Sequence, residues 1–177
     1  TDAHIHLEDY ALALQKVDCE TDTQKECLER ITKRVHTTPI GNWILGHGWN
    51  QNNWVEGYGN AEMLDEIAPH NPIYLTHKSL HCAWANSAAL QLAGITPNTV
   101  DPPGGRIGHL SNGDPDGILF ESAMGMLERV IPEASLDQTV KAIQEAIPLL
   151  WRMGLTGVHD FDGPRCFSAL QVLHGSD

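Results

Sequence analysis

The sequence contains few basic residues for its length. Its 177 residues include 11 Lys and Arg against 23 Asp and Glu, which gives a formal net charge of −12 at pH 7. Proteins whose main partner is nucleic acid or an anionic membrane surface present a basic patch to it. The charge balance therefore argues against both of these partners, and it favours solubility.

The sequence also lacks a long apolar run. No run approaches the roughly 20 residues of a membrane-spanning helix, and the first residues do not have the charged and then apolar form of a signal peptide. Hydrophobic residues make up 41% of the chain and charged residues 19%, which is typical of soluble globular proteins. We expect a soluble, cytoplasmic protein, and because the sequence begins at Thr1 rather than Met we expect further residues upstream.

Cysteine is scarce as well. The chain has four cysteines, with no CxxC pair among them: Cys19, Cys27, Cys82 and Cys166. Disulfide frameworks belong to much smaller secreted chains, so we expect buried or incidental free thiols in a reducing compartment.

Strand and helix patterns alternate along the chain. This alternation predicts an α/β fold with parallel strands. Buried strands are expected at Trp43–Gly46, Pro72–Thr76, Gly117–Phe120 and Leu155–Asp160, and helices at Leu7–Val17, Gln24–His36, Ala61–Ala68, Ala83–Ala93, Ser122–Val130, Ser135–Met153 and Arg165–Leu173. The segments His47–Gly59 and Thr96–Gly117 are rich in Gly, Asn or Pro and are expected to be loops.

Two histidines near the start of the chain, His4 and His6, have the spacing of a metal-binding pair. Residues i and i+2 of a strand point to the same side, so both imidazoles can reach one point if this segment is extended. Imidazole is the commonest neutral nitrogen ligand of zinc and similar divalent ions. A chain with ten histidines also contains such a spacing by chance, and a catalytic zinc usually has three protein ligands.

Further polar and aromatic residues stand where a site could form, and each has a structural alternative. His81 lies in a polar turn and is either a substrate contact or a hydrogen-bonded structural residue. His47 and Trp49 could line the same pocket, although Trp49 is otherwise a core anchor. Glu121 is a ligand, an acid–base group or a carboxylate favoured by a helix N-terminus.

The pair His159–Asp160 ends a predicted strand. It either belongs to the site or orients a loop. Asn86 begins a predicted helix and is expected to cap or brace it. The glycines of DPPGGRIG lack the strand and helix context of a nucleotide-binding loop. Cys82 directly follows His81, and adjacent strand residues face opposite ways, so a thiol nucleophile paired with that histidine is not expected.

Five motifs together resemble one enzyme family in their order along nearly the whole chain. They are DAHIHL, WILGHGWNQNNW, LDEIAPHNPIYLTHKSLHCAWANSAALQLAGI, DPPGGRIGHLSNGDPDGILFESAM and MGLTGVHDF. The sequence is similar to the metal-dependent amidohydrolases of family 3, the YtcJ-like group.

The resemblance implies a partial metal-dependent-hydrolase TIM barrel with an inserted α/β lobe. Residues 1–42 would form the first barrel strand and helices, 43–130 the inserted lobe on the substrate side, and 131–177 the return to the barrel. His4 and His6 would bind a divalent metal, zinc by expectation, as one or two ions in the full-length protein. The implied reaction is hydrolysis of a non-peptide C–N bond in a small-molecule amide, formamide or cyclic amide by metal-activated water.

The resemblance also implies that most of the site lies elsewhere. In the family the other ligands and the catalytic residues, namely a lysine, two further histidines and an aspartate, come from later barrel strands, so we expect them beyond Asp177. We therefore expect a fragment that is inactive alone, binds zinc weakly and forms homo-oligomers. The alternative is a non-catalytic α/β binding or interaction module that self-associates.

Overall fold

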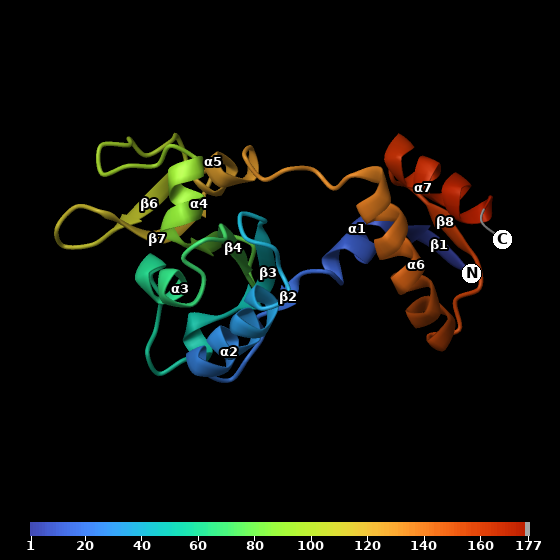
Figure 1. Cartoon of the computed structure of the whole chain (residues 1–177), viewed down its shortest axis with the longest axis horizontal. Helices are drawn as coiled ribbons and strands as arrows, with labels where there is room; N and C mark the ends of the chain where they lie inside the picture. The colour runs from blue at the N-terminus through green and yellow to red at the C-terminus, as the bar shows by residue number, and fades with distance from the viewer. Residues whose placement is uncertain (176–177) are drawn as a thin grey trace. The chain divides into compact units, whose positions relative to one another are not determined.

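A computed structural model describes residues 1–175, and Figure 1 shows the order of the elements. The chain divides into two compact units. The first unit consists of Thr1–Lys16 and Glu133–Asp177, and the second unit consists of Val17–Pro132. The second unit therefore interrupts the sequence of the first.

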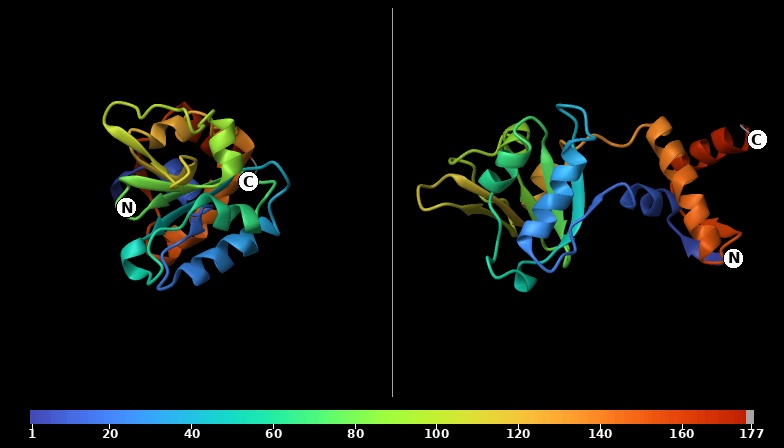
Figure 2. Two further views of the ribbon diagram at one scale, coloured as in Figure 1. Left: turned by 90° about the vertical axis from the view of Figure 1, so that its left-hand side faces the viewer. Right: turned by 60° about the horizontal axis from the view of Figure 1, so that its bottom comes forward.

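The first unit contains a two-stranded parallel sheet. Strand β1 (Asp2–Ile5) pairs with β8 (Val158–Asp160). Helix α6 (Leu136–Arg152) packs against both α1 (Leu7–Ala13) and α7 (Pro164–His174), and Figure 2 shows these three helices beside the sheet. The buried side chains of this core are Leu7, Ala11, Ala142, Ile143, Ala146, Leu150, Cys166 and Ala169.

Helix α6 begins where the sequence predicts it. The Ser135 hydroxyl accepts a hydrogen bond from the Gln138 backbone N–H at 3.3 Å, and the Gln138 side chain accepts one from the Ser135 N–H at 2.8 Å. This capping box satisfies two N–H groups that a helix start would otherwise leave unpaired. The apolar stripe of the helix then faces the core of the first unit.

The second unit is built on a six-stranded sheet of order β2-β3-β4-β5-β7-β6. Its strands are β2 (Val17–Asp18), β3 (Ile44–Trp49), β4 (Ile73–His77), β5 (Cys82–Ala85), β6 (Gly105–His109) and β7 (Pro115–Glu121). Strands β2, β3 and β4 are parallel, whereas β5, β7 and β6 each run antiparallel to their neighbours. The expectation of parallel strands is therefore wrong for half of this sheet.

Helices cover both faces of the six-stranded sheet. On one face α2 (Gln24–Val35) and α3 (Ala61–Ile67) pack over Ile73 and Leu75. On the other face α4 (Ser87–Leu92) and α5 (Met124–Glu128) pack over Tyr74 and Leu119. A short 3-10 helix, η1 (Gln51–Asn53), follows β3. Figures 1 and 2 show this layered arrangement.

Three expectations about local structure are wrong. The loop predicted from His47 starts later, because β3 pairs with β4 as far as Trp49. The helix predicted over Ala83–Ala93 starts only at Ser87, because the residues before it form β5 between β4 and β7. The irregular segment predicted over Thr96–Gly117 contains β6 and the start of β7, which pair as a hairpin. In each case cross-strand pairing overrides the local preference of the residues.

Among the described residues neither sheet closes into a barrel. The fold is mixed α/β, as expected in its class. Helix α2 belongs to the second unit, whereas the division drawn from the sequence placed it within residues 1–42. That division into 1–42, 43–130 and 131–177 stays a prediction.

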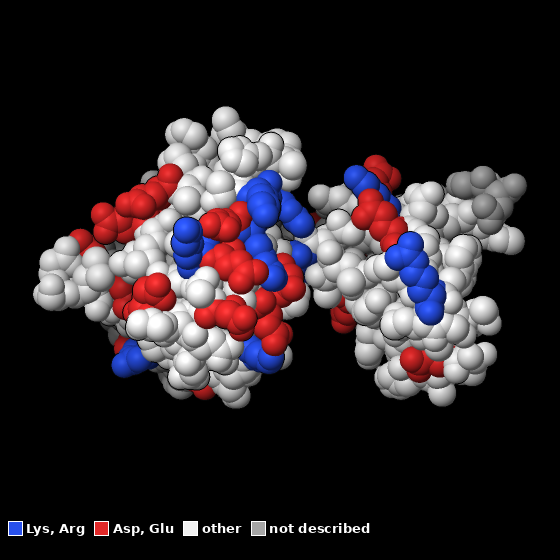
Figure 3. Space-filling view, turned by 90° about the horizontal axis from the view of Figure 1, so that it is seen from below, with Lys and Arg blue, Asp and Glu red and all other residues white. Residues whose placement is uncertain are grey.

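Charged residues of both signs lie side by side on the face of the second unit shown in Figure 3. Along α2 and beside it, Arg30 pairs with Glu26 and Asp18, and Lys25 pairs with Glu29. This exposed face therefore carries neighbouring charges of opposite sign.

Two findings bear on the composition. Within residues 1–175 no helix has the length and apolarity needed to cross a membrane. All four cysteines are buried free thiols, as the sequence predicts.

Candidate functional site

The structure brings His4 and His6 together at the end of β1. His4 lies in the strand, and His6 is the residue before the first turn of α1. Their ring centroids are 5.4 Å apart with an interplanar angle of 64°. Ligand nitrogens bind zinc at about 2.0–2.1 Å, so two rings this close can serve one ion.

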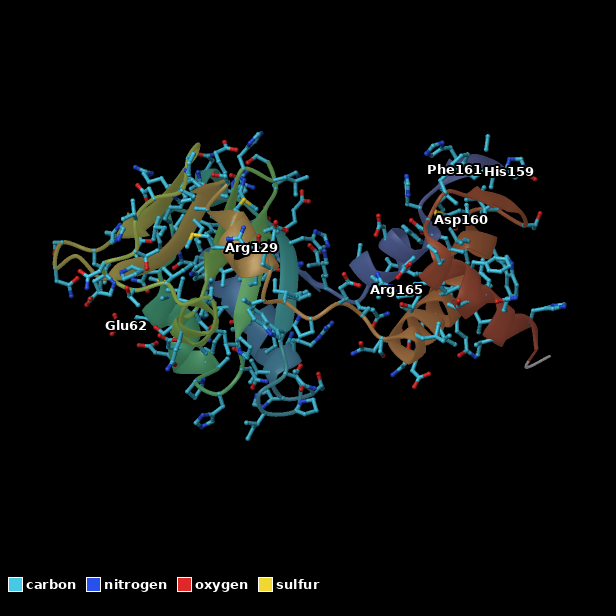
Figure 4. All side chains as sticks on the ribbon, turned by 90° about the horizontal axis from the view of Figure 1, so that it is seen from above. Glu62, Arg129, His159, Asp160, Phe161 and Arg165 are labelled. Atoms are coloured by element: carbon cyan, nitrogen blue, oxygen red, sulfur yellow. The ribbon has the colours of Figure 1, made fainter. Side chains whose placement is uncertain are left out.

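The turn after β8 holds the end of β1 in place. The Phe161 backbone N–H donates to the Ile5 carbonyl at 2.9 Å, and the Asp160 carboxylate accepts from the Leu7 N–H at 2.9 Å. The other Asp160 oxygen accepts from the Asp162 N–H at 3.2 Å. Figure 4 shows His159, Asp160 and Phe161 together at this end of the first unit.

The carboxylate of Asp160 accepts hydrogen bonds from the backbone N–H groups of Leu7 and Asp162. Burial alone would raise the pKa of its carboxyl, but hydrogen bonds from the Leu7 N–H, the Cys166 thiol and the Asp162 N–H outweigh burial and lower the pKa. Burial and then the Asp160 carboxylate raise the pKa of the Cys166 thiol to about 12. Cys166 is therefore a thiol near neutral pH, and Asp160 is a carboxylate that braces the turn.

Each histidine of the pair touches a different residue of the same turn. The His4 ring stacks on Phe161 with centroids 4.0 Å apart and planes 10° from parallel. The His6 Nδ1 lies 3.0 Å from the Asp162 Oδ1. The Asp162 side chain is only 7% exposed, whereas the His6 side chain is 51% exposed. The turn thus orients both rings.

An ion pair with a buried carboxylate supports the first turn of α1 beside this site. The Arg165 guanidinium donates to the carboxylate of Glu8, a side chain only 6% exposed, and also to Glu133 at 2.9 Å. The hydrogen bond with Glu8 raises the pKa of Arg165. Thr139 of α6 adds a hydroxyl 3.3 Å from Glu8. This network fixes the backbone next to His6.

The side chains at this end of the first unit fit part of a metal-binding set. His6, Asp9 and Asp162 offer ligand atoms that all lie within 4.8 Å of one another, and so do Asp160, Asp162 and Cys166. Because Nδ1 of His6 is engaged with Asp162, its Nε2 is the nitrogen left for an ion. Two imidazoles and nearby carboxylates are a donor set suited to zinc and similar divalent cations.

The other residues singled out from the sequence lie in the second unit. The His81 Nδ1 is 3.1 Å from the Glu121 carboxylate, and both side chains are more than half exposed. His47 is exposed on β3, whereas Trp49 is fully buried and its indole N–H donates to the Leu75 carbonyl at 2.9 Å. Trp49 thus has the contacts of a core anchor, and substrate contacts by these residues stay predictions.

Glu121 adopts a backbone conformation that L-residues seldom take. Its φ is +52°, in the left-handed region, and Leu80 in the turn before His81 has φ +64°. Such conformations cost about 1–3 kcal/mol each. They place Glu121 at the end of β7, where its N–H donates to the His81 carbonyl at 2.9 Å.

The sequence reasoning missed three residues that the structure makes prominent. Phe161 and Asp162 were not singled out, although Asp160 at the end of a strand and Asp162 just after it have the same spacing as His4 and His6. His77 was also missed, although it continues the alternation of Ile73 and Leu75 along β4. Burial and then the neighbouring His81 lower the pKa of His77.

Comparisons with solved structures match the fold of the chain. The crystal structure of an uncharacterized metal-dependent hydrolase from Pyrococcus furiosus superimposes with a TM-score of 0.71 over 99% of this chain and 34% of that one, at 24% identity. This likeness shows the fold of the chain, and it shows that the chain matches about a third of that hydrolase.

Comparisons with curated proteins extend the match to the sequence. YtcJ of Bacillus subtilis (strain 168) is 36% identical over 163 residues, which are 91% of this chain and 31% of that protein. The N-substituted formamide deformylase of Arthrobacter pascens is 36% identical over 167 residues, which are 90% of this chain and 31% of that enzyme. The chain thus spans less than a third of the length of these relatives.

The family comparison covers the histidine pair, the second unit and the turn after β8 in one match. The model of the amidohydrolase family matches residues 1–173, and with the YtcJ relative it confirms the resemblance seen in the motifs. The chain therefore belongs to the amidohydrolase family.

Proposed function

We propose that this chain supplies the first two metal ligands of a hydrolase that cleaves a non-peptide C–N bond in an amide, formamide or cyclic amide. The observation that carries the proposal is the placement of His4 and His6, which share one end of β1 with ring centroids 5.4 Å apart. The similarity to an N-substituted formamide deformylase supports the substrate class.

His4 and His6 would hold the divalent ion, which we expect to be zinc. When bound, such an ion supplies Lewis-acid polarisation of a carbonyl and activation of water. The chain's own residues orient the two rings: Phe161 stacks on His4, and Asp162 contacts the Nδ1 of His6. The remaining ligands and the catalytic residues would come from residues outside this chain.

The second unit would contact the substrate through exposed side chains. His81 is 71% exposed and its Nδ1 contacts Glu121, so its Nε2 is the nitrogen that would meet a polar group of a ligand. His47 is exposed on β3. We expect that His81→Ala raises KM of the whole enzyme more than it lowers kcat.

Zinc titration of the chain tests the metal assignment. Calorimetry compares the wild type with the double variant His4→Ala/His6→Ala and with His36→Ala/His70→Ala, which removes two exposed histidines of the second unit. The proposal requires that only the first double variant loses zinc binding. Equal zinc binding in all three proteins contradicts it. Formate release from an N-substituted formamide by the whole enzyme tests the reaction.

A further inference from the structure

The carboxylate of Asp162 has two acceptor oxygens, and each of them is used by the segment that follows β1. Oδ1 lies 3.0 Å from the His6 Nδ1, and Oδ2 accepts the backbone N–H of Glu8. The Glu8 N–H belongs to the first turn of α1, which has no cap from the His6 side chain. Asp162 therefore caps α1 from another part of the chain.

This arrangement decides which nitrogen of His6 carries the proton in the neutral ring. An ionised carboxylate accepts hydrogen bonds and does not donate them. His6 must therefore donate from Nδ1, which leaves the lone pair on Nε2. Metal-binding histidines usually donate their other ring N–H to a carboxylate or carbonyl in this way, and the partner fixes the tautomer and the ring orientation.

We propose that Asp162 is a positioning residue that holds His6 as the Nδ1–H tautomer, with Nε2 presented to a divalent cation. The inference rests on the proposed function for the identity of the ligand, but the tautomer is a property of the metal-free chain. Asp162 is suited to this task because its side chain is 7% exposed and its backbone N–H is tied to Asp160 at 3.2 Å. The carboxylate thus has little freedom to leave His6.

Asp162→Asn separates the positioning role from a purely structural one. Asparagine caps a helix about as well as aspartate, so it keeps the bond from the Glu8 N–H to its single carbonyl oxygen. Its NH₂ group then faces the His6 Nδ1 as a donor. The Glu8 backbone N–H can only donate a hydrogen bond, whereas the His6 Nδ1 can either donate or accept one. The His6 ring therefore switches to the Nε2–H tautomer and loses the lone pair on Nε2.

The experiment is ¹⁵N NMR of the His6 ring in the full 177-residue chain, with a chelator present and at a pH above 7.5. The proteins compared are the wild type, Asp162→Asn and the control Asp9→Asn. Asp9 lies near the same site but makes no hydrogen bond to His6 among the described contacts. We expect Nδ1–H in the wild type and in Asp9→Asn, and Nε2–H in Asp162→Asn. A wild-type ring that is mainly Nε2–H overturns the inference even if the variant does not fold.

Zinc titration of the wild type and Asp162→Asn gives the second readout. Partners of this kind contribute about 10–100-fold in metal affinity, so Asp162→Asn should weaken Zn²⁺ binding by that factor while thermal melting stays close to the wild type. Unchanged affinity in a variant whose tautomer has switched overturns the inference. If the wild type binds no zinc, the metal assignment fails, and the NMR result still decides the role of Asp162.

Discussion

The side chain of Asn86 accepts a hydrogen bond from the backbone N–H of Ile73 at 2.9 Å, which ties the start of α4 to the start of β4. The same oxygen accepts from the Ala89 N–H at 3.1 Å, as the cap of α4. The Asn86 amide N–H₂ donates to the carbonyls of Ala68 and Asn71. One fully buried side chain therefore satisfies four backbone groups.

Replacing Asn86 by Ala should destabilise the second unit strongly. A buried polar group left unpaired costs about 1–3 kcal/mol, and the lost cap adds about 1 kcal/mol. We expect the free energy of unfolding to fall by about 3 kcal/mol or more in urea denaturation. The exposed Asn98→Ala is the control and should change it by less than about 0.5 kcal/mol. A loss below about 1 kcal/mol for Asn86→Ala contradicts the bracing role.

The ion pair of Glu8 and Arg165 should contribute to the stability of the first unit. Arg165→Met leaves the buried Glu8 carboxylate without its cation. Breaking a fully buried pair costs about 3–5 kcal/mol, and since Arg165 is 37% exposed we expect about 2 kcal/mol. Adding Glu8→Gln to Arg165→Met should recover part of the loss, because a neutral amide is cheaper to bury. A double variant less stable than Arg165→Met would rule out this explanation.

Gly59 packs against an indole ring in a way that leaves no space for a side chain. A Cβ at this position would lie 2.3 Å from Trp84, whose side chain is fully buried. Gly59→Ala should therefore force Trp84 or the backbone to move and lower the free energy of unfolding by about 1–3 kcal/mol. The control is Gly163→Ala, because a Cβ at that position meets no other atom within 4 Å among residues 1–175. Equal stability of both variants refutes the prediction.

His77 predicts a pH dependence for the second unit. Its pKa in the folded chain is lowered from 6.5, by burial first and then by the neighbouring His81. As pH falls from 6.5 through the lowered value, the unfolded chain binds a proton that the folded chain does not, so stability falls. We expect a lower urea midpoint at pH 5 than at pH 7.5, with a smaller difference in His77→Gln. The control is the variant His70→Gln, which changes an exposed histidine. If the urea midpoint changes between pH 7.5 and pH 5 by the same amount in His77→Gln as in His70→Gln, the assignment to His77 is contradicted.

Exposed apolar side chains on two helices predict self-association. Trp151 of α6 and Phe167 of α7 are each 63% exposed. Burying apolar area contributes about 25 cal/mol per Å², so we expect the mass measured by light scattering to rise with concentration. The double variant Trp151→Glu/Phe167→Glu should remain closer to monomeric. A wild type that stays monomeric at high concentration contradicts the expected homo-oligomer.

The parts of the fold that the sequence predicts well depend on local patterns. Helix α6 follows from the capping box of Ser135 and Gln138 and from a regular apolar stripe, and both are properties of neighbouring residues. Helix α2 follows likewise from Thr23, whose side chain accepts the Glu26 N–H at 3.1 Å. Such patterns need no knowledge of the rest of the chain.

The parts that it does not predict depend on partners far away in the sequence. The β5 segment is rich in alanine and is a strand because it lies between β4 and β7. His4 and His6 were found from their spacing, but their contacts with Phe161 and Asp162 cross more than 150 residues. No local pattern around either histidine predicts which residue will orient it.

The insertion of the second unit between β1 and β8 has a consequence for the order of folding. The second unit has all of its pairing strands once Pro132 has been synthesised, whereas β1 finds its partner only when Val158–Asp160 has emerged. Contacts between distant segments form slowly because the intervening chain must first be closed into a loop. A second unit that is already folded leaves fewer flexible residues between β1 and β8, which lowers the entropy cost of pairing them. The histidine pair is thus synthesised before the second unit, and it gains its contacts with Phe161 and Asp162 only after that unit is complete.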